Sequence, residues 1–573
     1  MGFVQKYRGR LALAFMCLVM TTAFGLAIPW ILGEAVDVVV TQGERSVLIL
    51  TAGIVLGVVA LRGISAYGHS YLTAVVSQGT SYDVRNTLYS KLQRLSFAYH
   101  DQAHTGQLMS RATADVEGIR IFFGKGLLGT VQMLIMFVGI SYILITIDWQ
   151  LALLTLAFLP LVGWRAVVTG QRLYVTWLKI QRLVAALGTT LEENLTGIRV
   201  VKAFARQEEE SQKFTAHAQS LHDEHISIAR QWAFNVPLMV FLISLPVALI
   251  LWYGGRHVIA GSLTIGGLTQ FILYLSMLAM PVRRLGFMVN VFSRTMSAGR
   301  RILEVLDTQS LIQEKPDAIE LGNLKGHVDF KDVGFSYNSM APVLKHINFS
   351  VRPGESVALV GESGSGKSTI AHLIPRFYDV SSGSITIDGT DIRDATIASL
   401  RKNVAIVQQD VFLFSATIRD NIAFGAINAN MKQIIAVAEI AHLHNFIQSL
   451  PNGYDTWVGE RGVTLSGGEK QRLAVARTLL TNPKVLILDD STSNVDAGTE
   501  YLIRQALDRL IKGRTTFIIT HRLPIIKNAD LVLVIREGQI VERGRHNDLM
   551  ASDGLYRQIY QSQLSETQGM KGA

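Results

Sequence analysis

The chain contains 573 residues, which is more than a single ordinary domain holds. Only 17% of them are charged and the mean hydropathy is +0.29, and both values are unusual for a soluble protein of this length. A net charge of +9 fits either nucleic-acid binding or loops that face anionic lipid, and membrane spans would favour the lipid. Cys17 is the only cysteine, which excludes an intramolecular disulfide and a cysteine-based metal cluster.

The first half of the chain contains six long apolar stretches. They cover residues 11–33, 47–81, 126–147, 149–164, 231–255 and 257–282. A membrane-spanning helix needs roughly 20 apolar residues, and the helix of the short fourth stretch can continue past Arg165 into water. The alternative interpretation, long buried helices of a soluble protein, does not account well for six such apolar stretches in succession. The sequence therefore predicts a six-helix, all-α transmembrane domain. Arg62, inside the second stretch, is a candidate for substrate contact, with a structural role as the equal alternative.

Basic side chains predict which side of the membrane each connection faces. Nearly all the loop Lys and Arg residues lie in residues 77–125 and 165–230. The positive-inside rule therefore places both termini and these two long segments in the cytoplasm. Apolar residues at helical spacing, such as Leu88 and Leu92, predict that the long segments are helices. Each leg of about 20 residues would extend its span by roughly 30 Å beyond the lipid.

A change of pattern after the apolar half predicts a second domain. Residues 306–326, which contain Pro316 and Gly322, are predicted to form a linker. From residue 327 onward, short β-branched runs alternate with helical stretches, which is typical of an α/β domain with a largely parallel sheet. The runs cover residues 356–360, 484–488, 516–519 and 531–535. The expected organisation is a transmembrane domain over residues 1–305, the linker, and an α/β domain over residues 327–573.

A glycine-rich loop follows the first of these predicted strands. It fits the phosphate-binding pattern G-x-x-x-x-G-K-[ST] and consists of Gly361, Glu362, Ser363, Gly364, Ser365, Gly366, Lys367, Ser368 and Thr369. The glycines let backbone N–H groups approach phosphate oxygens, Lys367 can reach the β- and γ-phosphates, and Ser368 can coordinate Mg²⁺. The alternative is a generic glycine-rich turn, but the strand before the loop and the helix after it favour a nucleotide site.

Two further segments follow the loop in order. Leu465-Ser-Gly-Gly-Glu469 comes first, and the apolar run 485–488, closed by Asp489, comes second. Asp489 ends a predicted strand, so its carboxylate can face a metal ion at the edge of the sheet. An ordinary aspartate at a strand end is the alternative, and the two preceding motifs favour the metal ligand.

With these motifs in this order, the whole chain resembles a half-transporter of the ATP-binding cassette (ABC) exporter family, of the multidrug or lipid exporter type. The resemblance implies that Tyr337 stacks on adenine and that Gln409 senses Mg²⁺ and the γ-phosphate. It also implies that His521 is the switch histidine and that Asp496 belongs to the D-loop. The segment 465–469 matches the signature motif, which in this family binds ATP held by the opposite subunit. Its members here are Ser466, Gly467, Gly468 and Glu469.

The membrane half resembles the same family. Residues 97–111 and 192–204 are similar to its two coupling regions, and residues 254–261 are similar to the turn between spans five and six. Residues 301–307 resemble the exit toward the ATPase domain.

Three positions depart from the family pattern. Glu469 replaces the commoner Gln, Asn494-Val495 replaces Ala-Leu in the D-loop, and Asp490 replaces the Glu that acts as the base for hydrolysis. Asp is one methylene shorter, so its carboxylate falls about 1 Å or more short of the attacking water, which can cost roughly a hundredfold in rate. The resemblance therefore implies a weak ATP site in this chain and a partner chain with the catalytic Glu. A slowly working homodimer is the alternative.

The sequence thus predicts an exporter half that uses ATP and Mg²⁺ to move an amphipathic drug, lipid or peptide out of the cytoplasm by alternating access. Its expected partners are a second half-transporter, the lipid bilayer and the substrate, and the six spans argue against nucleic acid. The expected location is the cell membrane, with the ATPase domain in the cytoplasm. An ATP-gated channel or regulatory subunit with little turnover is the alternative, which Gln409 and His521 disfavour. No span carries a charge pattern that selects one kind of cargo.

Overall fold

The computed structural model describes residues 2–42, 45–337, 341–408, 410–426, 428–459, 462, 464–489, 497–520 and 523–569. Its internal contacts divide the chain into two units. The first comprises residues 1–94 and 103–309, and the second comprises residues 95–102 and 310–573. The division at residue 309 falls inside the predicted linker, and the domain boundaries at residues 305 and 327 stay predictions.

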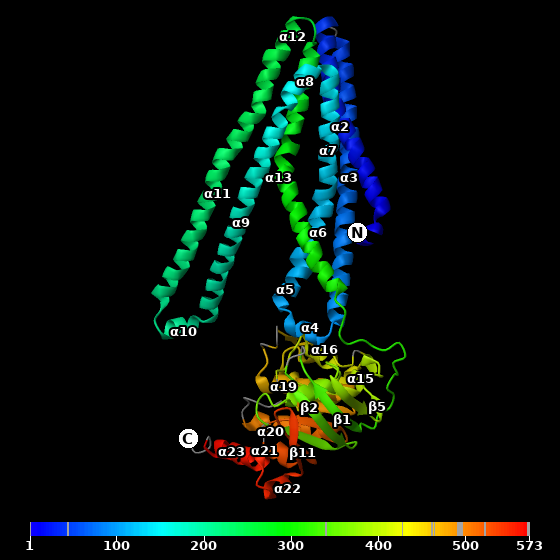
Figure 1. The fold of residues 1–573 in the computed structure, drawn as a ribbon, viewed down its shortest axis with the longest axis vertical. Helices are drawn as coiled ribbons and strands as arrows, with labels where there is room; N and C mark the ends of the chain where they lie inside the picture. Colours follow the sequence, from blue (N-terminus) through cyan, green and yellow to red (C-terminus); the bar gives the residue numbers. More distant parts are fainter. Residues whose placement is uncertain are drawn as a thin grey trace. The chain divides into compact units, whose positions relative to one another are not determined.

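The described residues of the first unit form helices and no strands. Its long helices are α2 (Arg8–Gln42), α3 (Arg45–Arg94), α7 (Leu127–Ile147), α9 (Phe158–Thr196), α11 (Gln207–Leu249) and α13 (Ile265–Asp307). The shorter elements are α1 (Gly2–Gln5), α5 (Thr105–Ser110), η1 (Arg111–Asp115), α6 (Val116–Ile121), η2 (Phe122–Gly126), α8 (Trp149–Leu156), α10 (Ile198–Ala203), η3 (Ile250–Gly254) and α12 (Gly255–Ile259); η1, η2 and η3 are π-helical turns. In Figure 1, α9 and α11 run side by side and α10 joins their ends, whereas α2, α3 and α7 form another group.

Six helical stretches in the described part of the chain are long and apolar enough to cross a membrane. They are Arg8–Val40, Leu48–Arg94, Thr105–Ile147, Trp149–Thr196, Gln207–Ile259 and Ile265–Asp307. The prediction of six spans with long helical extensions is therefore confirmed. The third and fourth spans separate at Asp148, whose carboxylate caps α8 by accepting the N–H groups of Gln150 and Leu151 at 3.0 Å each.

The structure corrects the predicted turn at residues 254–261. Helix α12 continues through Gly255–Ile259, and the chain turns only afterwards, before Thr264 caps α13 by accepting the N–H of Gly267. Gly254 serves close packing rather than a turn, because a Cβ there would lie 2.6 Å from Leu268 Cδ1. The sixth span accordingly begins at Ile265 and not at residue 257.

Helix α13 is held to the rest of the first unit at both ends. Near its start, the buried Tyr274 hydroxyl donates to the Leu26 carbonyl of α2 at 2.7 Å. Near its end, Arg301 Nε donates to the Asp115 carboxylate of η1 at 2.8 Å. For the Tyr274 contact, which lies within the spans, there is little hydrophobic force between helices in lipid, so an interhelical hydrogen bond, worth roughly 1 kcal/mol, helps to fix the packing. The Arg301 contact lies in the helical extensions that are predicted to be cytoplasmic.

The second unit is built on a six-stranded sheet with the strand order β12-β11-β3-β10-β9-β6. Strands β11, β3, β10, β9 and β6 are parallel and β12 is antiparallel to β11. An antiparallel sheet, β2-β1-β4-β5, and a two-stranded sheet, β7-β8, complete the strands of the described residues. The bounds are β1 (Val328–Phe335), β2 (Leu344–Val351), β3 (Ser356–Val360), β4 (Ser382–Ile387), β5 (Thr390–Asp391), β6 (Val404–Val407), β7 (Ala416–Thr417), β8 (Trp457–Val458), β9 (Val485–Asp489), β10 (Thr515–Ile519), β11 (Leu531–Arg536) and β12 (Gln539–Gly544).

Helices surround these sheets, as predicted for an α/β domain. They are α4 (Phe97–Gln102), α14 (Lys367–Leu373), α15 (Ile397–Asn403), α16 (Ile418–Ala423), α17 (Met431–Ile440), α18 (His444–Ser449), the 3-10 turn η4 (Gly453–Asp455), α19 (Gly467–Thr481), α20 (Ala497–Ile511), α21 (Leu523–Lys527), α22 (His546–Ala551) and α23 (Leu555–Gly569). Strands β3 and β10 are buried along their whole length, as expected for the centre of a parallel sheet.

The segment that leads into the second unit is packed against it. Leu321 is buried, and its N–H donates to the Ser399 hydroxyl. The Asp388 carboxylate accepts the N–H groups of Lys325 at 2.6 Å and His327 at 2.8 Å. These contacts fix the start of β1, so part of the predicted linker is ordered chain rather than a free tether.

Candidate nucleotide-binding site

The glycine-rich loop leaves the sheet between two other parallel strands. Strand β3 lies between β11 and β10 and ends at Val360, and the loop then leads into α14. A Cβ at Gly361 would lie 2.2 Å from the Ile535 carbonyl oxygen, so only glycine fits this close approach. Gly366 has φ +107, and a Cβ there would lie 2.7 Å from Leu344 Cδ2. A backbone carbonyl therefore selects glycine at the start of the loop, and a positive φ together with the Leu344 side chain selects it at Gly366.

Lys367 is folded back into the loop. Its ammonium group donates to the carbonyl oxygens of Gly361 at 2.8 Å and Glu362 at 2.7 Å. Only 8% of Lys367 is exposed, and this burial lowers the pKa of its amine, while the nearby Asp489 charge opposes the shift. The loop is thus curled around a buried cation, which is the arrangement needed to receive phosphate oxygens.

A buried hydroxyl in the same loop has no partner. Ser365 is 6% exposed, and its Oγ makes no hydrogen bond to any described residue. An unsatisfied buried polar group is costly, by about 1–3 kcal/mol, unless a ligand or water completes it. Ser368, the predicted Mg²⁺ ligand, is exposed at the start of α14, so its hydroxyl is accessible.

Tyr337 lies beside the first turn of α14. Its hydroxyl is 3.3 Å from Thr369 Oγ1, and its ring meets the Tyr378 ring edge-on with 5.1 Å between the centroids. The residue is half-buried, so part of its surface remains accessible. This position agrees with the predicted adenine-stacking role, which stays a prediction.

Replacing Tyr337 with alanine is expected to weaken ATP binding moderately, because an aromatic stack contributes about 0.5–1.5 kcal/mol beyond its buried area. Tyr337→Phe is the matched control, since it keeps the ring and removes only the hydroxyl contact with Thr369. Titration with a fluorescent ATP analogue measures both. An unchanged affinity in Tyr337→Ala would remove Tyr337 from the site.

Asp489 lies at the same edge of the sheet as the loop. In the strand register, Ile519 of β10 pairs with Leu359 of β3 on one side and with Asp489 of β9 on the other. The carboxyl ends of these parallel strands therefore meet at one edge, as the sequence predicted. Four predicted site residues, Gln409, Asp490, Asp496 and His521, lie outside the described residues.

The predicted signature segment begins helix α19. Ser466 is its N-cap: the Ser466 hydroxyl accepts the Glu469 N–H at 3.4 Å, and the Glu469 carboxylate accepts the Ser466 N–H at 2.7 Å. This reciprocal capping box explains why Glu serves where Gln is commoner, because both side chains can accept that hydrogen bond. Ser466 and Gly467 are exposed at the positive end of a 15-residue helix.

Sequence reasoning missed a half-buried arginine that anchors α19. Arg477 donates to the Asn421 carbonyl at 2.9 Å and to the Phe412 carbonyl at 3.2 Å, and the Asn421 side chain bridges the N–H and carbonyl of Phe414. Burial lowers the pKa of the Arg477 guanidinium. These contacts tie the signature helix to the segment that follows the predicted Gln409. An arginine on an otherwise apolar helix face was the available signal.

Helix α4, in the first predicted coupling region, belongs to the second unit by its contacts. The Phe97 ring stacks on the Phe377 ring with 4.2 Å between the centroids. The Tyr378 hydroxyl donates to the Asp101 carboxylate, and burial together with this bond raises the pKa of Tyr378, so the donor keeps its proton. Tyr378 also touches Tyr337, which links α4 to the nucleotide loop through two rings.

A phosphate-binding loop, a capped signature helix and six membrane spans in one chain define an ATPase-coupled transporter. Residues 11–282 match the family of the ABC transporter transmembrane region, and residues 344–493 match the ABC transporter family. The chain therefore belongs to the ABC transporter family, as an exporter half-transporter in which the membrane domain precedes the ATPase domain. It is a multi-pass membrane protein with a cytoplasmic, ATP-binding ATPase domain.

Relatives match over almost the full length. The chain is 37% identical to the uncharacterized ABC transporter ATP-binding protein YknU of Bacillus subtilis (strain 168), over 98% of this chain and 97% of that protein. It is 36% identical to the ATP-dependent lipid A-core flippase of Syntrophus aciditrophicus (strain SB), over 98% of this chain and 93% of that protein. A solved structure of a bacterial Atm1-family ABC exporter with ATP bound matches with a TM-score of 0.80 and 30% identity, covering 97% of this chain and 98% of that one.

Proposed function

We propose that this chain is one half of an exporter that moves an amphipathic drug, lipid or peptide out of the cytoplasm by alternating access. The observation that carries the proposal is the nucleotide loop with its buried Lys367, in one chain with a helical membrane unit that holds a cavity of about 1270 Å³. The relatives named as ATP-dependent lipid A-core flippases support an amphipathic cargo.

We assign the nucleotide contacts as follows. The N–H groups of the glycine loop and the Lys367 ammonium hold the phosphates of ATP, and Tyr337 packs on the base. The exposed Ser368 hydroxyl and the Asp489 carboxylate, with the Gln409 amide from outside the described residues, would supply oxygen donors that suit Mg²⁺, which would offset the phosphate charge. The exposed start of α19 offers its N–H groups to ATP held by the opposite subunit.

The proposal includes a different chain as the partner. Its motivation is Asp490, which stands where the family has Glu. The weak site would combine this chain's glycine loop, Asp489 and His521 with the partner's signature. The competent site would combine the partner's Glu with Ser466, Gly467 and Gly468 of this chain. The test is to purify the tagged chain from its native membrane and to identify the protein chains that co-purify with it. Recovery of a homodimer alone contradicts the proposal.

An ATP-gated channel or regulatory subunit is the second candidate, and Asp490 is the observation that favours it. ATPase measurements in proteoliposomes separate the two. A transporter hydrolyses ATP faster when its substrate is present, because substrate and nucleotide bias the same conformational equilibrium. A basal rate that no amphipath changes, together with ATP-dependent passive permeation, would favour the channel.

The proposed topology puts residues 77–125 and 165–230 in the cytoplasm of a cell whose plasma membrane holds the chain. We expect a cysteine introduced at Ser211, in α11, to resist a membrane-impermeant thiol reagent on intact cells, whereas one at Ala260 should react. Both positions are exposed and differ in the predicted side of the membrane. Cys17→Ala provides the background, and permeabilised cells provide the control in which both sites react. The reverse labelling pattern would refute the topology.

A further inference from the structure

A buried arginine follows the helix of the phosphate-binding loop. Arg376 lies three positions after the end of α14 and is only 3% exposed. Its N–H donates to the Leu373 carbonyl at 3.0 Å, which fixes it to the end of that helix. Its φ of +52 lies in the left-handed region, which costs free energy in a residue other than glycine. Such a backbone persists only where surrounding contacts determine it, and it is concentrated at functional positions.

The contacts that hold Arg376 involve its whole guanidinium. Nε and Nη2 donate to the Asp379 carboxylate at 2.7 and 3.2 Å, so the buried charge is neutralised. Nη1 donates to the Arg393 carbonyl at 3.3 Å, and Nη2 also donates to the Gln313 carbonyl at 3.1 Å. The planar fork of arginine can bind a carboxylate and two carbonyls together, whereas the ammonium of lysine cannot reproduce that geometry.

Gln313 begins the segment by which the chain enters the second unit, residues 313–321, which we call the entry strap. Further polar contacts fasten the strap to the segment 394–397. They join the Glu314 carboxylate to the Ile397 N–H at 2.6 Å, the Lys315 ammonium to the Asp394 carboxylate, and the Ile319 N–H to the Asp394 carbonyl at 2.7 Å. The strap is therefore held at several points along its length.

Apolar burial does not account for this attachment. Residues 313–317 are all exposed, and the Ile319 side chain is 57% exposed. Leu321, at the end of the strap, is buried. A segment that only sealed the edge of a sheet would bury its apolar side chains along its length. The polar contacts instead fix the position of a segment that remains largely in water.

The strap is closely tied to the sixth span along the chain. Helix α13 ends at Asp307, and Arg376 holds the chain again at Gln313. Residues 308–312 lie between these points, and even fully extended they reach only about 18 Å. A tether this short transmits a displacement to the end of α13, whereas a long flexible linker would absorb it.

The residues around Arg376 also receive the first coupling region. Arg401 Nη2 donates to the Arg376 carbonyl at 3.0 Å, and the Arg401 guanidinium lies over the Phe377 ring, 5.2 Å from its centroid. The Phe377 ring in turn stacks on Phe97 of α4. Two segments that continue along the chain into membrane spans, α4 and the entry strap, therefore attach to the residues that follow α14.

We propose that Arg376 is a positioning residue that couples ATP binding to the sixth span. It fastens the entry strap to the end of α14, so that a movement of the phosphate-loop helix pulls on α13 through the short tether. The inference rests on the proposed alternating-access function and adds a connection along the backbone to the one through α4.

The sharpest test lengthens the tether and leaves the contacts of the strap in place. Gly-Ser-Gly-Ser is inserted after Ser310. The same insertion after Asp553, in the exposed turn between α22 and α23, is the matched control.

A second variant tests Arg376 itself. Arg376→Lys keeps a positive charge beside Asp379 and loses the fork that reaches the strap. Arg514→Lys is its control, because Arg514 also bridges carbonyl oxygens of the second unit, those of Pro483 and Leu510.

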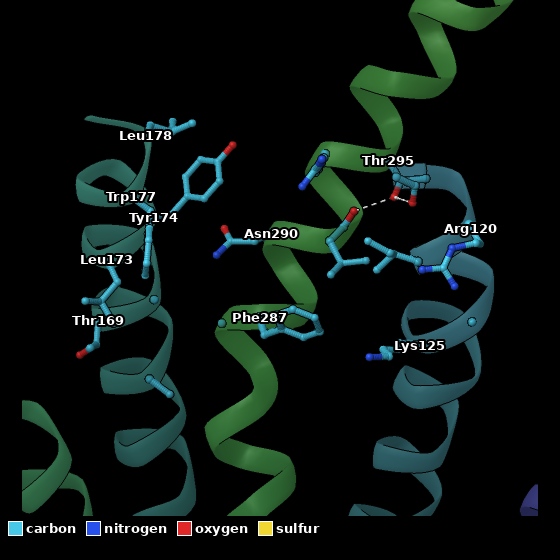
Figure 2. Close-up of a pocket in the computed structure, with 18 of the residues that line it drawn as sticks. Arg120, Lys125, Thr169, Leu173, Tyr174, Trp177, Leu178, Phe287, Asn290 and Thr295 are labelled. Carbon is cyan, nitrogen blue, oxygen red and sulfur yellow. Dashed lines mark hydrogen bonds between the residues drawn. The ribbon is translucent and has the colours of Figure 1, made fainter. Parts of the chain in front are cut away.

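Phe287 of α13, which lines the cavity of the first unit in Figure 2, provides the reporter position. The full transporter with Phe287→Cys, in a background that includes Cys17→Ala and has no other cysteine, is reconstituted in lipid nanodiscs. The rate of thiol labelling is measured with and without a non-hydrolysable ATP analogue. Photolabelling with azido-ATP measures nucleotide occupancy in the same preparations.

We expect the analogue to change the labelling rate when the tether is native. The insertion after Ser310 and Arg376→Lys should each reduce that change at least about fivefold, which is the lower end of typical coupling between sites. Nucleotide occupancy should stay unchanged, which separates lost coupling from a damaged domain, and both controls should respond like the native tether.

A full response with the longer tether, or in Arg376→Lys, overturns the inference while alternating access stands. Loss of nucleotide occupancy in Arg376→Lys also overturns it, because Arg376 would then only maintain the nucleotide site. If the analogue changes the labelling rate of no protein, including the one with the native tether, the proposed alternating access fails as well.

Discussion

Replacing Lys367 with alanine is expected to weaken ATP binding at this chain's loop by about 100-fold or more. The amine is buried against two loop carbonyls and is the one side-chain cation of the loop. A hydrogen bond to a charged group contributes about 1.5–3 kcal/mol, and the lysine can reach two phosphates. Photolabelling with an azido-ATP analogue measures occupancy of this chain separately from its partner.

Lys402→Ala is the matched control for this variant, because it removes an exposed lysine of the same unit, on α15. Lys367→Ala should also leave the protein folded, since alanine suits the first turn of α14. If Lys367→Ala is labelled at the same azido-ATP concentrations as the wild type, the loop does not bind phosphate as assigned.

The second large effect is expected at the signature helix. Ser466→Arg should abolish most ATP hydrolysis by the assembled transporter, because Ser466 is exposed at the start of α19 and arginine would fill the space where ATP of the competent site docks. Asp490→Asn should change the rate little, because general-base assistance, worth about 10²–10⁴-fold, would come from the partner's Glu. Steady-state phosphate release measures both variants.

Ser466→Ala separates blockage from loss of the helix cap. It removes the capping hydroxyl, which costs about 0.5–2 kcal/mol of helix stability, but adds no bulk. If Ser466→Ala hydrolyses ATP rapidly while Ser466→Arg is inactive, the defect of Ser466→Arg comes from blocking the ATP-binding space and not from losing the helix cap. If Asp490→Asn abolishes turnover instead, Asp490 is a working base and the asymmetric assignment is wrong.

Much of this molecule could be predicted from local sequence because its determinants are local. Apolar runs set the six spans, the single charge at Asp148 marks the break between two of them, and Gly361, Gly364 and Gly366 of the loop adopt positive φ values that favour glycine. The predicted turn at residues 254–261 is wrong, since a glycine such as Gly254 can serve close helix packing as well as a turn. Glu469 departs from the family pattern, and only the hydrogen bond from the Ser466 N–H shows its capping role.

The cavity of the first unit could not be predicted, because residues that are far apart in the sequence, such as Lys125 and Arg294, line it together. Lys125 and Arg294 lie 169 positions apart, and each alone resembles an ordinary cytoplasmic charge. The ion pair between Asp115 and Arg301 joins residues 186 positions apart, and only the folded helices show that contact. The same holds for α4, whose Phe97 stacks on a ring 280 positions later.

Uphill transport tests the central claim most directly. The transporter is reconstituted so that its ATPase domains face outward, and a labelled amphipath that stimulates its ATPase is followed into the vesicle lumen. The account predicts accumulation above the external concentration with ATP, and none with a non-hydrolysable analogue or with Ser466→Arg. If ATP only speeds equilibration, and the lumenal concentration never exceeds the external one, the chain is a gated pore and not an exporter.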